Sequence, residues 1–396
     1  MRRAIRLRAG KFSPRYQVFM QYRELVRPSV LDQPVYEPGK PIEYVAREFG
    51  LEVASILKLA SNENPLGPSP LGIEAAERAL KEAHFYPDGG CWALRKALAE
   101  KFELHADQFI VTNGSNEFMT LLCQAFCGPG DEAVMGAQSF IAFKIGVLLA
   151  GGTPVEVAMP DLRHDLDALV DAVTPKTKLV YLPCPNNPTG DRHSQAAIEA
   201  LIDRLPDHVI FCFDEAYAEY SDDAPDLRPL LARGKKVVCC RTFSKIYGLA
   251  AFRVGYAYGD PELIALLNRV RAPFNVNAIG QAAATAALGD EDHVARSKSI
   301  NDAGLRQLAL GFEELGLEYR IDGGNFALLK VENPARIFEL LQHQGVIVRP
   351  LKPYLLAHHI RVTVGAETQN ARLLSCLRDI LAGENSGTPR GEQPLL

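Results

Sequence analysis

The sequence predicts an α/β protein with two domains, a large one with a mostly parallel seven-stranded sheet and a smaller α+β one. The chain has 396 residues, which is longer than one ordinary domain. Hydrophobic residues make up 47% of it, enough for a buried core in each domain. From about residue 108, short β-branched runs alternate with helical periodicity, the pattern of parallel βα units. After about residue 276, long helical stretches precede short strands, which predicts a separate α+β domain.

The seven predicted strands of the large sheet are short runs of apolar and β-branched residues. They are FIVT (109–112), EAVM (132–135), PVEVA (154–158), KLVYLP (178–183), VIFCFD (209–214), KVVCCR (236–241) and RVGYAY (253–258). Predicted helices between them include 115–127, 165–173 and 261–270. The last has Asp260 as its N-cap and Pro261 at its first position.

The predicted small domain begins with long helices over about 279–315. It continues with strand FALLKV, helix ARIFELLQHQG, strands VIVRP and IRVTVG, and a closing helix near 367–382. We therefore divide the chain into a basic extension (1–30), an arm with part of the small domain (31–75), a large domain (76–275), a small domain (276–383) and a Gly- and Pro-rich disordered tail (384–396).

Composition narrows the class of function. The net charge is −5 and both signs are interspersed, which argues against nucleic acid or an anionic membrane as partner. No apolar stretch has membrane-spanning length. The eight cysteines lie mostly in apolar runs without a CxxC and His pattern, so we expect reduced core thiols, no metal site and a cytoplasmic protein. The substrate should be a small molecule.

Residues 1–27 differ from the rest, with eight Arg or Lys and a single acid, Glu24. A transit peptide can have this charge pattern, but it usually contains more serine than the single Ser13 here. We favour a loosely ordered arm, or an upstream start codon with Met20 as the true start.

Four short elements carry candidate chemistry, and each follows a predicted strand. In RTFSKIYGLAAFRVG (241–255), Lys245 and Arg253 place an amine and a guanidinium around one anionic ligand, and Ser244 can donate to it. Upstream, VIFCFDEAYAEY ends a strand with Asp214 among apolar neighbours, a position that requires a cationic partner; Tyr217 follows. Taken alone, Lys245 and Arg253 could be ordinary surface residues at a strand end, and Asp214 could be a residue that caps the next turn.

The other two elements are turns. LPCPNNPTG projects Asn187 from a strand end, and FIVTNGSNE opens a helix with Ser115 and Asn116, whose free N–H groups suit a phosphate. In isolation they are a plain loop and a plain helix cap with Glu117. Their order favours a site, because ligands of α/β sheets bind beyond the carboxyl ends of the strands.

These elements, in this order, resemble the fold-type-I aminotransferases, and most closely the histidinol-phosphate branch, from Tyr36 to about residue 382. The matching strings are YEPGKPIEYVAREFG, KLASNENPLGPSP, YPDGG, LRKALA, TNGSNE, FCGPGDE, PNNPTG, DEAYAEY, RTFSK and RVTVG. The resemblance implies pyridoxal 5′-phosphate (PLP) as cofactor and a homodimer with shared active sites. It implies a transaminase of histidine biosynthesis that interconverts L-histidinol phosphate plus 2-oxoglutarate and imidazole-acetol phosphate plus L-glutamate.

The resemblance also assigns roles by position. Lys245 resembles the lysine that holds PLP as a Schiff base and moves the substrate's α-proton, and Asp214 the partner of the pyridine nitrogen. The other cofactor residues are Asn187 and Tyr217 at the ring oxygen, Phe140 stacked on the ring, Ser115, Asn116, Ser244 and Arg253 at the phosphate, and Tyr86 reaching a neighbouring subunit's PLP. The substrate residues are Arg361, Arg349, Asn64 and Tyr36.

Two departures from the branch leave the substrate open. After Arg349 the chain has PLKPYLLAHH instead of a Gly-rich or Leu-Pro turn, and Cys91 and Trp92 stand where relatives have other residues. The alternatives are an aromatic amino-acid aminotransferase and a lyase resembling threonine-phosphate decarboxylase, because fold and cofactor do not determine the substrate. A PLP-sensing regulator is disfavoured, because too few residues precede the arm for a DNA-binding domain.

Overall fold

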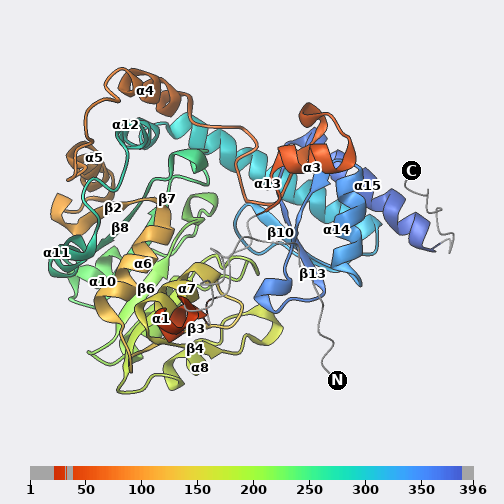
Figure 1. The fold of residues 1–396 in the computed structure, drawn as a ribbon. Coiled ribbons are helices and arrows are strands. Elements are labelled where there is room, and N and C mark those ends of the chain that lie inside the picture. The colour runs from red at the N-terminus through yellow and green to blue at the C-terminus, as the bar shows by residue number, and fades with distance from the viewer. Residues whose placement is uncertain (1–21, 32, 34–38, 386–396) are drawn as a thin grey trace, which may run out of the picture.

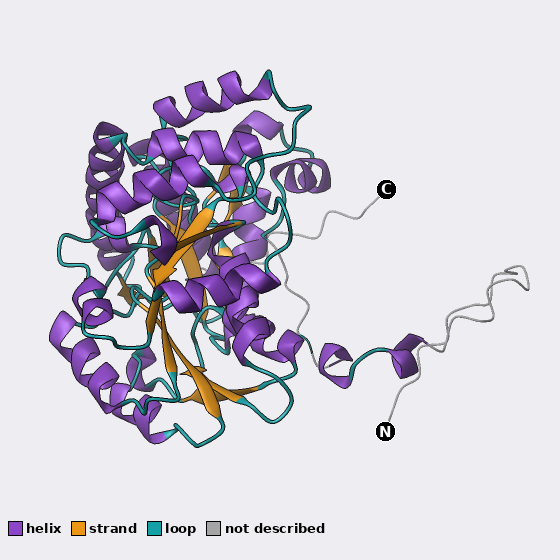
Figure 2. Ribbon diagram, turned by 90° about the vertical axis from the view of Figure 1, so that its left-hand side faces the viewer, coloured by secondary structure: helices purple, strands orange, loops and turns teal. Residues whose placement is uncertain are grey.

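The computed structural model describes residues 22–31, 33 and 39–385. Figure 1 shows a large α/β unit on the left and a smaller unit with β10, β13, α14 and α15 on the right, with α13 running across between them. In Figure 2 helices lie on both sides of the strands. The predicted combination of a large α/β domain and a smaller α+β domain is therefore confirmed.

The large unit contains all seven predicted strands in one sheet. In spatial order they are β2 (Phe109–Thr112), β8 (Gly255–Gly259), β7 (Val237–Thr242), β6 (Ile210–Asp214), β5 (Thr177–Pro183), β3 (Glu132–Gly136) and β4 (Thr153–Val157). β8 is antiparallel to both of its neighbours, and the other pairs are parallel. The sheet is thus mostly parallel, as predicted.

Alternate residues of each strand enter two different cores, because side chains of a strand point to opposite faces. In β6, Phe211 and Phe213 pack in one core and Cys212 in the other. The first core includes residues of α5 (Trp92–Phe102), α9 (Gln195–Arg204), α10 (Arg228–Ala232) and α12 (Ala278–Ala287), with α8 (Leu166–Asp171) beside them. The second includes α6 (Gly114–Phe126), α7 (Ile141–Ala150) and α11 (Pro261–Val270). Both faces of the sheet are therefore buried.

The small unit is built on an antiparallel sheet in the order β12 (Arg349–Pro350), β13 (His359–Thr363), β10 (Phe326–Lys330) and β9 (Tyr319–Arg320). Its core includes residues of α13 (Glu291–Glu314), α14 (Pro334–His343) and α15 (Glu367–Asn385). The prediction of one strand VIVRP is wrong. Val346–Ile347 (β11) pairs with β1 (Leu57–Lys58), and the chain then turns so that β12 pairs with β13.

The predicted boundary between residues 275 and 276 stays a proposal, and packing favours a later one. Helix α12 lies against α4 (Pro70–Leu80), and its Ala283, Ala284 and Ala287 belong to the core of the seven-stranded sheet. Helix α3 (Ile42–Phe49) instead places Val45 against Ile347 of the small unit.

The chain ends lie mostly beyond the described residues. The expectation for residues 1–21 falls outside them, while α1 (Tyr22–Leu25) and α2 (Pro28–Leu31) are helical, and Gln33 Nε2 donates to the carbonyl of Ile145 (3.0 Å). The predicted tail began at residue 384, but α15 continues to Asn385; residues 386–396 lie outside the described range.

All eight cysteines are buried free thiols, as predicted. Among the described helices, none is both long and apolar enough to cross a membrane.

Candidate active site

A cavity of about 260 Å³ opens beyond the carboxyl ends of β5, β6 and β7, where the small unit meets the large one. Its lining brings together eleven of the residues predicted from the sequence. They are Ser115, Asn116, Phe140, Asn187, Asp214, Tyr217, Ser244, Lys245, Arg253, Arg349 and Arg361. The four strand-end elements therefore converge, as expected for a site at the edge of a parallel sheet.

Lys245 follows β7 and is directed into the cavity. Its Nζ donates to the carbonyl oxygen of Ser61 (3.2 Å) and lies 5.8 Å from the centre of the Tyr217 ring. Burial and, to a lesser extent, the positive charge of Arg361 lower the pKa of Lys245 to about 7. A substantial fraction of this amine is therefore unprotonated near neutral pH, the form that attacks a carbonyl.

Asp214 ends β6 as a buried carboxylate with two neutral hydrogen-bond donors. The Tyr181 hydroxyl donates to Oδ2 (2.8 Å) and the Ala216 N–H donates to Oδ1 (3.0 Å). Burial raises the pKa of Asp214 to about 6, although the hydrogen bond from Tyr181 opposes the rise. A cation in the cavity would restore the low pKa, so the carboxylate suits a protonated ring nitrogen.

Two hydrogen-bonded pairs form the wall between the units. Asn62 Nδ2 donates to the Tyr217 hydroxyl (2.8 Å), and Arg361 Nη1 donates to Asn187 Oδ1 (2.5 Å). Burial raises the pKa of Tyr217 to about 12, so its phenol stays protonated. The amide of Asn187 and the phenol of Tyr217 can both donate to a ring oxygen.

One end of the cavity lies at the first turn of α6. Arg253 Nη1 donates to Ser244 Oγ (3.2 Å), and the Ser115 and Asn116 side chains line the same end of the cavity. Gly114 is required here, because it has φ +73° and an added Cβ would lie 2.7 Å from Arg253 Nη2. A guanidinium, hydroxyls and a helix N-terminus together form an anion site.

Phe140 lines the cavity as the residue before α7, and its ring packs partly on the core between the sheet and α6. An apolar ring at this position suits a planar aromatic ligand.

Arg349 and Arg361 supply positive charge from the small unit. They are directly opposite each other in the antiparallel register of β12 and β13, and both line the cavity. Arg361 is buried, and its Nη2 also donates to the carbonyl of Ala60 (2.6 Å).

Three predicted residues are not in the cavity lining. Tyr86 is 83% exposed and stacks on Phe274 (4.9 Å between ring centres). Asn64 faces another way, because its Nδ2 donates to the Ile246 carbonyl (2.7 Å) and to Ser297 Oγ (2.8 Å). Tyr36 lies outside the described residues.

The sequence analysis missed Asn62, Glu63 and Tyr354, which also line the cavity. Asn62 is buried and has φ +55°, and its backbone N–H donates to Thr363 Oγ1 (2.9 Å). The string NEN at 62–64 was a usable signal, but it does not tell which of its two amides faces the cavity. Tyr354 lies in the segment after Arg349 that departs from the branch.

The lining residues fit PLP. A nucleophilic amine, a buried carboxylate, ring-oxygen donors, an aromatic wall and an anion site match its carbonyl, ring nitrogen, phenolic oxygen, ring face and phosphate respectively.

Comparison with known proteins gives the same indication. The sequence model of the family described as "Aminotransferase class I and II" matches residues 54–379. Histidinol-phosphate aminotransferase 2 of Pseudomonas fluorescens is 42% identical over 361 residues, covering 90% of this chain and 98% of the relative. Histidinol-phosphate aminotransferase of Akkermansia muciniphila is 41% identical over 363 residues, covering 91% and 100%.

Solved structures are similar over nearly the whole chain. Histidinol-phosphate aminotransferase from Sinorhizobium meliloti, in complex with PLP, matches with a TM-score of 0.83 and 26% identity, covering 91% of this chain and 98% of that one. A double mutant of Thermus thermophilus aspartate aminotransferase matches with a TM-score of 0.78 and 25% identity, covering 90% and 99%.

Proposed function

We propose, from the premise that this chain belongs to the class I and II aminotransferase family, that it is the transaminase acting on L-histidinol phosphate. The reaction interconverts L-histidinol phosphate plus 2-oxoglutarate and imidazole-acetol phosphate plus L-glutamate, with PLP as cofactor, in histidine biosynthesis. The name is shared by relatives above 40% identity that the chain covers almost completely.

The observation that carries the substrate proposal is the opposed pair Arg349 and Arg361. The two substrates differ in their anionic group, since one carries a phosphate dianion and the other a carboxylate. A planar guanidinium can bind either group through two parallel hydrogen bonds, and a second one adds the charge that a dianion requires. Both side chains line the cavity that holds Lys245.

The cofactor, when bound, supplies the electron sink that makes the substrate's α-proton removable. The residues of the chain supply position and proton transfer. The Lys245 amine would take the α-proton of the substrate and later give a proton back, acting first as a base and then as an acid. Asp214 would hold the ring nitrogen of the cofactor protonated, and Asn187 and Tyr217 would donate to its ring oxygen.

The phosphate site anchors the cofactor while Lys245 is free to act as a base. Ser115 and Asn116 lie in α6 after β2 and Ser244 follows β7, whereas Asp214 ends β6, so the cofactor would be held at more than one point. Fixing the ring this way lowers the entropy lost when the substrate reacts.

The proposal includes a cytoplasmic homodimer with shared active sites. Tyr86 would extend from one subunit to the cofactor phosphate in the other, which agrees with its exposed position outside the cavity of its own chain.

Steady-state kinetics tests the substrate. We expect kcat/KM with L-histidinol phosphate, measured with 2-oxoglutarate as acceptor, to exceed that with L-phenylalanine. O-phospho-L-threonine should release no CO₂. A higher kcat/KM for phenylalanine would instead identify an aromatic aminotransferase, and CO₂ release without 2-oxoglutarate consumption would identify a lyase.

A further inference from the structure

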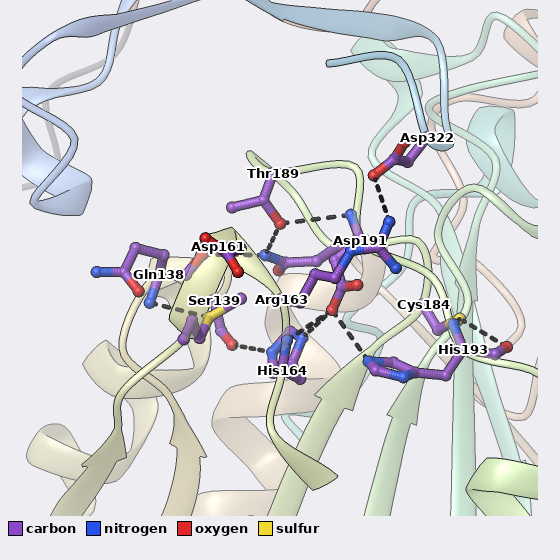
Figure 3. A network of polar contacts seen from close by, with 12 residues as sticks. Gln138, Ser139, Asp161, Arg163, His164, Cys184, Thr189, Asp191, His193 and Asp322 are labelled. Carbon is purple, nitrogen blue, oxygen red and sulfur yellow. Dashed lines mark hydrogen bonds and ion pairs between the residues drawn. The ribbon is translucent and has the colours of Figure 1, made fainter. Parts of the chain in front are cut away.

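A buried polar cluster lies beside the cavity and does not line it. The cluster consists of four residues: Ser139, His164, Asp191 and His193. Ser139 directly precedes Phe140 of the cavity lining, and His164 comes shortly after the 3₁₀ turn Pro160–Leu162. Asp191 and His193 follow the PNNPTG turn. Figure 3 shows the two imidazole rings directed at one carboxylate. The side chains of His164 and Asp191 are fully buried, and that of His193 is 13% exposed.

One oxygen of Asp191, Oδ2, takes three contacts from the two histidines. His164 Nδ1 lies 2.9 Å and His193 Nε2 3.0 Å from Oδ2, and the His164 N–H also donates to it (2.8 Å). The other nitrogen of His164, Nε2, lies 2.8 Å from Ser139 Oγ. Among the described residues, His164, Asp191 and His193 are the one group of three whose ligand-type atoms all lie within 4.8 Å of one another.

Several acceptors here lack a protein donor. Asp191 Oδ1 is buried with no hydrogen-bond partner in the described structure, and so are Asn186 Oδ1 and Gln138 Oε1 of the adjoining segments. These segments are joined, since Asn186 Nδ2 donates to the Gln138 carbonyl (3.1 Å). Buried oxygens without protein donors mark a place where a water or a cation can bind, because an unsatisfied buried acceptor is costly.

Two kinds of occupant fit this cluster differently. Water would supply donors to the three unpartnered oxygens and would leave the imidazoles bonded to Asp191 as they are. A divalent transition metal would use the two imidazoles and the carboxylate as ligands, a set typical of Zn²⁺ and related ions. The Oδ1 atom of Asp191 favours the metal, because it has no protein donor and belongs to the carboxylate that both imidazoles contact, so it offers the ion a ligand atom that no hydrogen bond occupies.

We propose that His164 Nδ1, His193 Nε2 and the Asp191 carboxylate form a binding site for a divalent transition metal, with Zn²⁺ the best match. Binding displaces the protons that now lie between the imidazoles and the carboxylate. His164 then carries its proton on Nε2 and donates a hydrogen bond to Ser139 Oγ. This is possible because a serine hydroxyl can accept a hydrogen bond as well as donate one. A ligating imidazole usually donates its other N–H in this way. The ion enters from the side of His193, the partly exposed ligand.

The site would stabilise the segment that positions Asn187. The turn from Asn186 to Asp191 is closed by the Asn186 N–H donating to the Asp191 carbonyl (2.8 Å), and Asn187 within it contacts Arg361. The ion would thus be structural and distinct from the transaminase chemistry, so its presence does not depend on which substrate is correct.

Metal binding to the PLP-loaded enzyme tests this proposal. The protein is first treated with EDTA and dialysed, and Zn²⁺ uptake is then measured by equilibrium dialysis with elemental analysis; Co²⁺ serves as a coloured probe. We expect the wild type to bind one equivalent that His193→Gln lacks, with the ligand-field absorption of Co²⁺ lost in the variant. Removing one of three ligands should weaken the dissociation constant by roughly a hundredfold or more, since even outer-shell changes cost 10–100-fold.

A matched variant controls for adventitious binding. His358 is exposed and lies in the small unit, with its Nδ1 3.4 Å from the Glu332 carbonyl, so His358→Gln should bind as the wild type does. Ser139→Ala should retain the ion with a dissociation constant about tenfold weaker. Equal binding by wild type and His193→Gln, or no stoichiometric ion at micromolar concentration, would overturn the proposal and leave a water-filled hydrogen-bond cluster.

Discussion

Arg349 and Arg361 lie directly opposite each other across β12 and β13, and both line the same cavity. Like charges in this arrangement destabilise a sheet, so a bound anion has an electrostatic role in the structure as well as in recognition. A dianionic substrate should depend on the pair more strongly than a monoanionic one.

We expect Arg349→Gln to lower kcat/KM for L-histidinol phosphate by about 10–100-fold, because a hydrogen bond to a charged group contributes about 1.5–3 kcal/mol. The half-reaction with L-glutamate should lose less. Single-turnover absorbance changes with each substrate measure the two effects separately. Arg336→Gln, which removes an exposed charge paired with Glu339, is the control and should change neither. An equal loss for both substrates would contradict phosphate recognition by Arg349.

The second prediction concerns Lys245, whose pKa burial lowers to about 7. In the cofactor-free enzyme, the rate of PLP capture should rise about tenfold per pH unit below pH 7 and level off above it, because only the neutral amine attacks. Stopped-flow absorbance over pH 5.5–9 measures this rate. A rate still rising at pH 9 would indicate an ordinary lysine. Borohydride reduction followed by peptide mapping should place the pyridoxyl label on Lys245, and Lys245→Ala should take up none.

The third prediction tests how Asp214 is kept ionised. Tyr181→Phe removes a hydrogen bond that opposes the burial-driven rise in the pKa of Asp214, so this pKa should rise further. We expect PLP to bind about tenfold more weakly near pH 7, where a larger fraction of the carboxyl is protonated, and the deficit should shrink as pH rises. Absorbance titration measures the dissociation constant. Tyr319→Phe removes an exposed hydroxyl bonded to Glu313 and should bind PLP normally.

The pH dependence of the cofactor-free protein follows from the same group. The folded-state pKa of Asp214, about 6, lies above its ordinary value of 3.8. The folded protein therefore binds more protons than the unfolded chain between these values, and the contribution of Asp214 to stability falls as pH rises from about 4 to 6. PLP should remove this loss, because its ring nitrogen provides the cation. Denaturant unfolding at pH 4.5 and 6.5, with and without PLP, measures the difference.

The cofactor half of the site was predictable because its signals are local. Lys245 and Asn187 each follow a strand by a few residues and Asp214 ends one, so finding the strands was enough to place them at one edge of the sheet. The placement of Arg349 directly opposite Arg361 was harder to predict, because it depends on the register between two short strands. The break within VIVRP depended on a partner strand almost 300 residues upstream.

Other features lacked any local signal. His164 and Asp191 are 27 residues apart in two loops, and their contact follows only from the packing of β3, β5 and their connections. The shared active site proposed for Tyr86 involves a second chain, which local sequence patterns do not place. These are cases in which tertiary packing, and not propensity, decides where a side chain goes.

A further prediction separates steric contact from backbone strain at the anion site beside Arg253. Gly114→Ala places a Cβ 2.7 Å from Arg253 Nη2 in a residue with φ +73°, whereas Gly234→Ala has nearly the same φ, +75°, and nothing within 4 Å. Both should lose about 1–2 kcal/mol of stability, because a residue with a Cβ is strained in the left-handed backbone conformation. Only Gly114→Ala should also weaken PLP binding, by displacing Arg253. Equal PLP affinities in the two variants would show that Arg253 does not contact the phosphate.

The last prediction concerns Asn62 and Asn64, two amides two residues apart with different surroundings. Asn62 Nδ2 donates to the Tyr217 hydroxyl inside the cavity, while Asn64 bonds Ile246 and Ser297 outside it. Asn62→Ala frees the Tyr217 hydroxyl to reorient, so the absorbance maximum of bound PLP and its pH dependence should shift, with kcat/KM falling about tenfold. Asn64→Ala should lower the unfolding temperature, since two partly buried hydrogen bonds are lost, and leave the spectrum of bound PLP unchanged. If Asn64→Ala instead raises KM for L-histidinol phosphate at constant stability, then Asn64 binds substrate in a conformation different from the one described.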